Sequence, residues 1–183
     1  MPPDDSRHRP PLHVTFVCSG NICRSPMGDV VLRDLLAEAG LADAVTVDSA
    51  GTGGWHVGDG ADPRTVRTLR RHGHDGASHV ARHFTPDWFD GRDLVLASDS
   101  GHVEQLVRLA RSDEERERIH LVREYDPVAV AAADLETDDP FYGDDDDFER
   151  CYREVEAACR GLVDELRARL GRGEAGRADR PRS

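Results

Sequence analysis

Two thiols and a guanidinium stand within seven residues of one another in the segment HVTFVCSGNICRSP, residues 13–26. Cys18 ends an apolar, β-branched run, and Cys23 and Arg24 follow a turn of small residues. Such a turn between a strand and a helix can aim its backbone N–H groups and the helix N-terminus at one anion. The helix N-terminus and a neighbouring arginine both favour the thiolate form of a cysteine. The segment therefore predicts a sulfur nucleophile under a bound oxyanion.

Three other interpretations of these cysteines are weaker. A single buried cysteine at a strand end is usually inert packing, but Cys18 is accompanied here by Arg24 and a glycine-containing turn. A zinc pair would need a matching second pair of ligands downstream, which the chain lacks. Four cysteines in 183 residues are too few for a disulfide scaffold. Gly20 and Asn21 are residue types that tolerate the left-handed backbone such a loop requires.

Strand and helix patterns alternate on both sides of this loop. Short apolar strands are predicted at residues 13–18, 44–50, 93–98 and 119–125, and helices at 26–40, 63–73, 100–111 and 145–170. Strands separated by helices indicate an α/β fold with a mainly parallel sheet. Ligands of such sheets bind beyond the carboxyl ends of the strands, where the loop after the first strand lies.

Composition limits the classes of function. The length predicts one domain, residues 12–170, with a disordered leader at 1–11 and a disordered tail at 171–183. The net charge of −12 disfavours nucleic-acid binding as the main role. Every fixed cation is an arginine, so an anion must be held by arginine or by backbone N–H groups. No apolar window is long enough for a membrane span and the first residues carry no signal-peptide core, so we expect a cytoplasmic protein.

The spacing Cys-x5-Arg-Ser and its surroundings resemble the low-molecular-weight protein tyrosine phosphatase family, and bacterial members most of all. The similarity includes VCSGNICRSPM around the loop, then DSAGTGGWHVG at 48–58, HVAR at 79–82, YDP at 125–127 and DDPFYGDDDDFE at 138–149, in the family's order. It covers roughly residues 12–170. It implies a single three-layer α/β domain with a four-stranded parallel sheet of order 2-1-3-4, helices on both faces, and a phosphate-binding loop after strand 1.

The resemblance assigns roles to residues of this chain. Cys18 is the expected nucleophile, Arg24 the expected phosphate clamp and Asp139 the expected general acid, with Asp138 as its only close rival. The remaining expected residues form the phosphate-binding loop (Ser19, Gly20, Asn21, Ile22, Cys23, Ser25), the substrate pocket (Trp55, Phe141, Tyr142) and the support of the loop (Ser49, His79). Phe141 replaces the family's commoner tyrosine, so no hydroxyl-dependent role is expected there. Asp144–Asp147 are expected to stabilise a helix N-terminus instead.

The expected activity is hydrolysis of phosphotyrosine and aryl phosphate monoesters through a cysteinyl-phosphate, without metal or cofactor. Phosphotyrosine proteins are the expected substrates and inorganic phosphate the expected product and inhibitor, with no nucleic-acid or membrane partner. For Cys23 the alternatives are packing behind the loop and, by the resemblance, a reversible disulfide with oxidised Cys18. The rival enzyme is a thioredoxin-coupled arsenate reductase that relays oxidation through Cys151 and Cys159. A catalytically dead phosphotyrosine-binding module is a further alternative.

Overall fold

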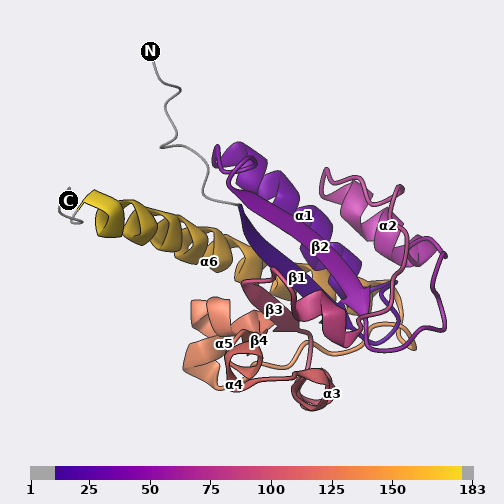
Figure 1. Ribbon diagram of the computed structural model, residues 1–183. Coiled ribbons are helices and arrows are strands. Elements are labelled where there is room, and N and C mark those ends of the chain that lie inside the picture. Colours follow the sequence, from indigo (N-terminus) through magenta and orange to yellow (C-terminus); the bar gives the residue numbers. More distant parts are fainter. Residues whose placement is uncertain (1–10, 179–183) are drawn as a thin grey trace.

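A four-stranded parallel sheet forms the centre of the molecule in the computed structural model, which describes residues 11–178 (Figure 1). The strands β1 (Leu12–Cys18), β2 (Val45–Gly51), β3 (Leu94–Ala97) and β4 (Ile119–Leu121) lie in the order β2-β1-β3-β4. Each neighbouring pair is parallel. The predicted sheet order is confirmed, and β1 occupies the middle, where its carboxyl end is flanked by the ends of β2 and β3.

Helices cover both faces of this sheet. On one face, α1 (Arg24–Glu38), α2 (Pro63–Arg71) and α6 (Asp145–Ala178) enclose a core that includes Phe16 and Phe148. On the other face, α3 (Ser100–Leu109) and the 3-10 turn η2 (Pro86–Phe89) enclose a smaller core with Val17 and Phe89. Side chains of consecutive strand residues point to opposite faces, so Phe16 and Val17 belong to different cores. The expected three layers are confirmed.

Three short elements that the sequence patterns did not predict follow β3 and β4. They are α4 (Asp113–Arg116), the 3-10 turn η3 (Val122–Tyr125) and α5 (Pro127–Ala132). The strand predicted for residues 119–125 is wrong in its second half, because β4 ends at Leu121 and η3 follows. The physical reason is local: the Glu124 carboxylate accepts a hydrogen bond from the backbone N–H of Leu121 and turns the chain there.

The last helix is longer than the pattern predicts. α6 continues to Ala178, so the prediction of a disordered tail from residue 171 is wrong for residues 171–178. Glu165 on the helix surface pairs with Arg169 and with Arg172, which supports the helix across Gly171. The leader expected at residues 1–10 and the tail residues 179–183 lie outside the described residues. No helix within residues 11–178 is long and apolar enough to cross a membrane.

Candidate active site

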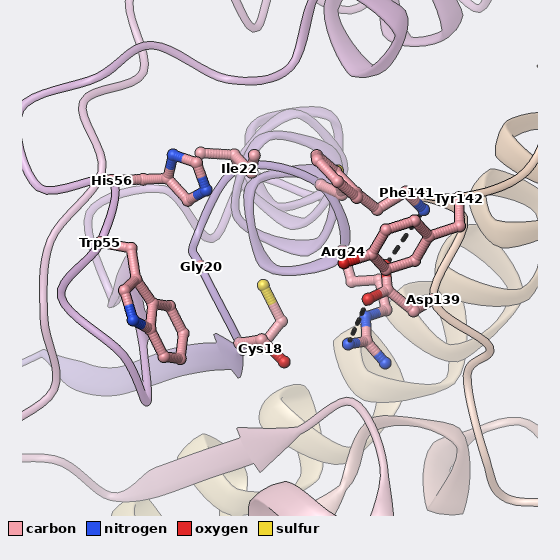
Figure 2. A pocket seen from close by; sticks show the side chains of 11 residues that line it. Cys18, Gly20, Ile22, Arg24, Trp55, His56, Asp139, Phe141 and Tyr142 are labelled. Atoms are coloured by element: carbon pink, nitrogen blue, oxygen red, sulfur yellow. Dashed lines mark hydrogen bonds and ion pairs between the residues drawn. The ribbon is translucent and has the colours of Figure 1, made fainter.

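The loop from Cys18 to Arg24 joins the end of β1 to the start of α1 and faces a cleft (Figure 2). Asn21 has a φ of 58°, whereas Gly20 is not left-handed, so of the two predicted positions Asn21 alone uses that conformation. Gly51, at the end of β2, lies under the loop: a Cβ there would be 2.6 Å from the carbonyl oxygen of Ser19. Absence of a side chain at Gly51 therefore allows the loop to lie directly on the end of β2.

Carbonyl oxygens of the loop are turned outward into the scaffold. Those of Cys18 and Ser19 accept hydrogen bonds from the N–H groups of Thr52 (2.8 Å) and Gly53 (2.9 Å). The carbonyls of Asn21 and Ile22 accept from Nε2 of His79 (2.7 Å) and the N–H of Asp62 (2.9 Å). In a trans peptide the C=O and the following N–H point in opposite directions. The N–H groups that follow these four carbonyls therefore point into the loop, where they can bind an anion.

The Cys18 thiol sits inside this ring of N–H groups. It is 3% exposed, and its Sγ lies 2.9 Å from Oγ of Ser25 in the first turn of α1. Ser25 also accepts a hydrogen bond from Nδ2 of Asn21 (2.8 Å), whose Oδ1 accepts one from the Arg82 N–H (2.9 Å). The structure thus brings together Cys18, Asn21, Ser25 and His79. A hydroxyl that already accepts from Asn21 can donate its own proton to a thiolate.

Ser49 differs from the expectation that it belongs to the same hydrogen-bond network as Asn21, Ser25 and His79. Its hydroxyl instead donates to the Asp29 carboxylate on α1 (3.0 Å). Burial of Asp29 raises its pKa to about 6, despite the opposing charge of Arg33 and the hydrogen bond from Ser49. Ser49 therefore supports α1 behind the loop rather than the loop itself.

Arg24 is 4% exposed and is held on three sides. Its Nη1 donates to Oδ2 of Asp99 (2.7 Å) and to the carbonyl oxygen of Thr137 (2.9 Å). Its Nη2 lies 3.6 Å from Oδ2 of Asp139. Burial alone would raise the pKa of Asp99, but hydrogen bonds from His102 and from the Arg24 guanidinium hold it well below its usual range. Asp99 is thus a fixed negative charge that orients the guanidinium beside Cys18.

The Asp139 side chain points toward Arg24 from the opposite side of the cleft from Trp55 (Figure 2). Its Oδ1 accepts a hydrogen bond from the Phe141 N–H across Pro140 (3.1 Å), which fixes the carboxyl group as the Asp-Pro sequence predicts. The segment before it is anchored, because the N–H of Thr137 donates to the carbonyl of Ser98 (2.9 Å). Asp139 remains solvent-accessible, with 41% of its side chain exposed.

Aromatic rings form the two walls of the cleft. Trp55 (77% exposed) stands on the side of His56, and Phe141 and Tyr142 (91% exposed) stand on the other, with the Cys18 sulfur between them (Figure 2). Phe141 is partly buried and packs against the main core, and Arg64 lies over its ring at 5.6 Å from the centroid. The two exposed rings are therefore free to contact a planar group that enters the cleft.

Three residues at this site were not identified from the sequence: His56 in the cleft wall, Asp99, and His102 behind the loop. Asp99 and His102 come directly after β3, whose carboxyl end neighbours that of β1. Polar residues at that position, in SDSGH, are the signal that could have found them.

The cysteines of α6 do not line the cleft. Cys151 and Cys159 are 2% and 0% exposed on the side of α6 that packs into the core, and burial raises the pKa of both thiols. Cys23 is 4% exposed, and burial together with the negative charges of Asp62 and Cys18 raises its pKa to about 12. Cys18 and Cys23 both line the cleft with Arg24 and Asp139, but the pKa of the Cys23 thiol is raised to about 12, which leaves Cys18 as the candidate nucleophile.

A family model described as "Low molecular weight phosphotyrosine protein phosphatase" matches residues 13–172. This chain belongs to that family. A low molecular weight protein-tyrosine-phosphatase from Streptomyces coelicolor is 51% identical over 157 residues, which cover 86% of this chain and 94% of the relative. Low molecular weight protein-tyrosine phosphatase A from Mycobacterium tuberculosis is 44% identical over 162 residues, covering 88% and 96%.

Among solved structures, YfkJ from Bacillus subtilis matches with a TM-score of 0.80 and 31% identity, covering 88% of this chain and 98% of that one. The predicted family is therefore confirmed, and the phosphatase is a phosphoric monoester hydrolase. The bacterial relatives at 44–51% identity also confirm that the similarity to bacterial members is close.

Proposed function

We propose that this phosphatase hydrolyses phosphotyrosine in protein substrates, and aryl phosphates generally, through a cysteinyl-phosphate formed on Cys18. The observation that carries the proposal is the arrangement of Cys18, Arg24 and Asp139 around one ring of inward-pointing backbone N–H groups. A dianionic phosphate bound in that ring would have its phosphorus atom next to the Cys18 sulfur. Two of its oxygens would lie in reach of the Arg24 guanidinium, which suits bidentate binding.

In the first step the Cys18 thiolate attacks phosphorus while the Asp139 carboxyl group protonates the departing phenolic oxygen. The P–O bond to tyrosine breaks as the S–P bond forms. Negative charge that develops on the equatorial oxygens is stabilised by Arg24 and the loop N–H groups. Ser25, 2.9 Å from the sulfur, is placed to stabilise the thiolate and its later departure.

In the second step Asp139, now a carboxylate, takes a proton from water as that water attacks phosphorus. The S–P bond breaks, and inorganic phosphate and the free thiolate are released. Arginine and backbone donors supply the stabilising charge in both steps, so the proposed mechanism uses no metal ion. It requires a thiolate and a protonated carboxyl group at once, so we expect a bell-shaped pH-rate profile with an acidic optimum.

The exposed rings of Trp55 and Tyr142 flank the sulfur and support an aryl substrate, because their faces can contact a phenyl group that stands on the bound phosphate. The open cleft also admits a phosphotyrosine that remains part of a protein. We place the reaction in the cytoplasm, with phosphoproteins as substrates and phosphate as product and competitive inhibitor.

The two rival functions find less support in the structure. An arsenate reductase would require Cys151 and Cys159 to exchange disulfides with Cys18, yet both thiols are buried in the core. A phosphotyrosine-binding module without turnover would not need a carboxyl group aimed at the clamp arginine, as Asp139 is. Parallel assays of arsenate reduction and aryl phosphate hydrolysis distinguish the enzymes directly.

The decisive experiment is hydrolysis of p-nitrophenyl phosphate and of phenyl phosphate by the wild type and variants. Cys18→Ser should abolish turnover of both; retained turnover would contradict the assignment. Asp139→Ala should slow phenyl phosphate more than p-nitrophenyl phosphate, because the better leaving group needs less protonation. Asp138→Ala is the matched control, since it removes an adjacent exposed carboxylate and should leave both rates near those of the wild type.

For Cys23 we propose the protective disulfide: oxidised Cys18 (a sulfenic acid) would form an S–S bond with Cys23 and release water. Cys18 and Cys23 line the same cleft, which supports this pairing. After peroxide treatment, Cys23→Ser should keep its initial turnover but lose recovery by dithiothreitol. Full recovery of activity in Cys23→Ser would contradict the disulfide and leave Cys23 with a packing role.

A further inference from the structure

Behind the phosphate-binding loop, one histidine side chain connects the loop to the anchor of the clamp arginine. Nε2 of His102 lies 2.8 Å from Oγ of Ser19, the residue after the nucleophile. Nδ1 of the same ring lies 3.0 Å from Oδ1 of Asp99, whose other oxygen accepts from Arg24 at 2.7 Å. A continuous chain of polar contacts, Ser19–His102–Asp99–Arg24, therefore joins the two sides of the loop.

The place of His102 in the fold makes this chain rigid. Asp99 is the N-cap of α3, and Oδ1 accepts the backbone N–H of His102 (3.0 Å) as well as facing its ring. His102 is 3% exposed, so its ring has no solvent to replace a lost partner. A buried polar group without a partner is costly, and the ring is held by the contact of Nε2 with Ser19 and by the close approach of Nδ1 to the Asp99 carboxylate.

The chemistry of the neighbours limits the partners of the ring. The Asp99 carboxylate can only accept, so a hydrogen on Nδ1 faces it. Nε2 and the Ser19 hydroxyl share one hydrogen, and either of the two atoms can be its donor. The carbonyl of Ser19 is bound separately by the Gly53 N–H (2.9 Å), so both the side chain and the backbone of this loop residue are fixed.

We propose that His102 is a positioning residue for the phosphatase reaction: through Ser19 it orients the peptide N–H groups next to Cys18, and through Asp99 it keeps that orientation in register with Arg24. The proposal rests on the phosphatase function proposed above. The ring does not touch the substrate. It acts on the geometry that the transition state requires, in which backbone donors and the guanidinium must bind the same equatorial oxygens.

Two variants remove the same contact from opposite sides. Ser19→Ala removes the hydroxyl group. His102→Asn places an amide near the position of Nδ1, so this variant keeps the contact with Asp99 and loses the contact with the Ser19 hydroxyl. Loss of one hydrogen bond predicts a fall in kcat of roughly fivefold in each variant. The double variant should fall by the same factor as either single variant, because both remove one contact. His120→Asn on β4, which alters a histidine paired with Glu124 outside the site, is the matched control.

Binding of orthovanadate, measured by calorimetry, provides a readout that does not need turnover. Its five-coordinate adduct with a thiolate imitates the transition state, so its affinity should fall by the same roughly fivefold factor in all three variants, whereas inorganic phosphate should weaken by no more than about twofold. His102→Ala, which loses both contacts, should lose more than His102→Asn, and melting temperatures of Ser19→Ala and the wild type should agree.

Each contrary outcome refers to a different claim. Multiplied losses in the double variant, or unchanged kcat and vanadate affinity in Ser19→Ala and His102→Asn, would overturn the role of His102. Equal losses in His120→Asn would show a general effect on folding and also overturn it. A wild type that binds vanadate but does not hydrolyse aryl phosphate would refute the proposed function instead, and the vanadate affinities of the variants would still test His102.

Discussion

Replacing Asp99 by asparagine tests how much the orientation of the clamp arginine contributes to the reaction. The two carboxylate oxygens have separate tasks, since Oδ2 accepts from Arg24 and Oδ1 faces the N–H and ring of His102. Asparagine has one acceptor oxygen and an NH2 group in place of the other. Whichever way the amide lies, one N–H group of Arg24 or His102 faces another donor.

The size of the effect follows from this loss. A hydrogen bond to a charged group contributes about 1.5–3 kcal/mol, and each 1.4 kcal/mol is about a factor of ten in rate. Arg24 keeps its bond to the Thr137 carbonyl (2.9 Å), so the guanidinium stays in the site but is less well oriented. We therefore expect kcat/KM for p-nitrophenyl phosphate to fall by roughly 10- to 150-fold. Asparagine caps helices as well as aspartate does, so α3 should remain intact.

The assay is steady-state hydrolysis with the melting temperature measured in parallel. Asp113→Asn is the matched control, because that aspartate is in the first turn of α4, 93% exposed and paired only with Arg116 on the surface. Its kcat/KM should stay within about twofold of the wild type, as surface pairs contribute little. If Asp99→Asn also stayed within that range, the clamp would not depend on its carboxylate anchor and the reasoning would be refuted.

Three further predictions concern thiol reactivity, pH and packing. Iodoacetamide at pH 7 should add one label, on Cys18, because the pKa of Cys23 is raised to about 12; mass spectrometry that finds Cys23 labelled at a similar rate would contradict this. The pKa of Asp29 is about 6 in the folded state and about 3.9 in the unfolded state. The contribution of this carboxyl group to stability is therefore fully present below about pH 3.9 and is lost as the pH rises through 6. The loss amounts to about 3 kcal/mol. Asp29→Asn should flatten the free energy of unfolding between those pH values, and an unchanged slope in urea titrations would count against the buried carboxyl. Gly51→Ala would place a Cβ 2.6 Å from the Ser19 carbonyl oxygen and should displace the loop. If the displacement raises the barrier by roughly 1.4 kcal/mol or more, kcat falls by at least tenfold. Turnover equal to that of the wild type would show that the loop can move away from the new methyl group without loss of activity.

Local patterns were sufficient to predict the frame of the molecule. The apolar run before Cys18 and the helical spacing after it predicted β1, the loop and α1, because strands and helices have different periods. The errors occur where a side chain overrides that periodicity. Glu124 ends β4 early by capping Leu121, and ion pairs of Glu165 with Arg169 and Arg172 support α6 across Gly171. Neither interaction belongs to the apolar periodicity from which the strands and helices were predicted.

The site was predictable where its residues lie close together in the chain, and less so elsewhere. Cys18 and Arg24 were evident from their spacing, and Asp139 from its Asp-Pro turn together with the family resemblance. Asp99 and His102 are more than 70 residues from the loop. Only the parallel pairing of β1 with β3 brings the two strand ends together. A histidine gains its role here from two contacts that the fold creates, and one of nine histidines cannot be distinguished before that pairing is known.

The outward-turned carbonyls of the loop have a consequence for protein engineering. The donors to those carbonyls lie 34 to 58 residues downstream of the carbonyls they bind; they are Thr52, Gly53, Asp62 and His79. Grafting the eight letters CSGNICRS onto a different strand–helix turn would transfer the sulfur and the guanidinium but not the direction of the peptide planes. The loop can therefore be transferred only together with the groups that donate hydrogen bonds to its carbonyl oxygens, and a designer who wants an anion receptor must transplant both.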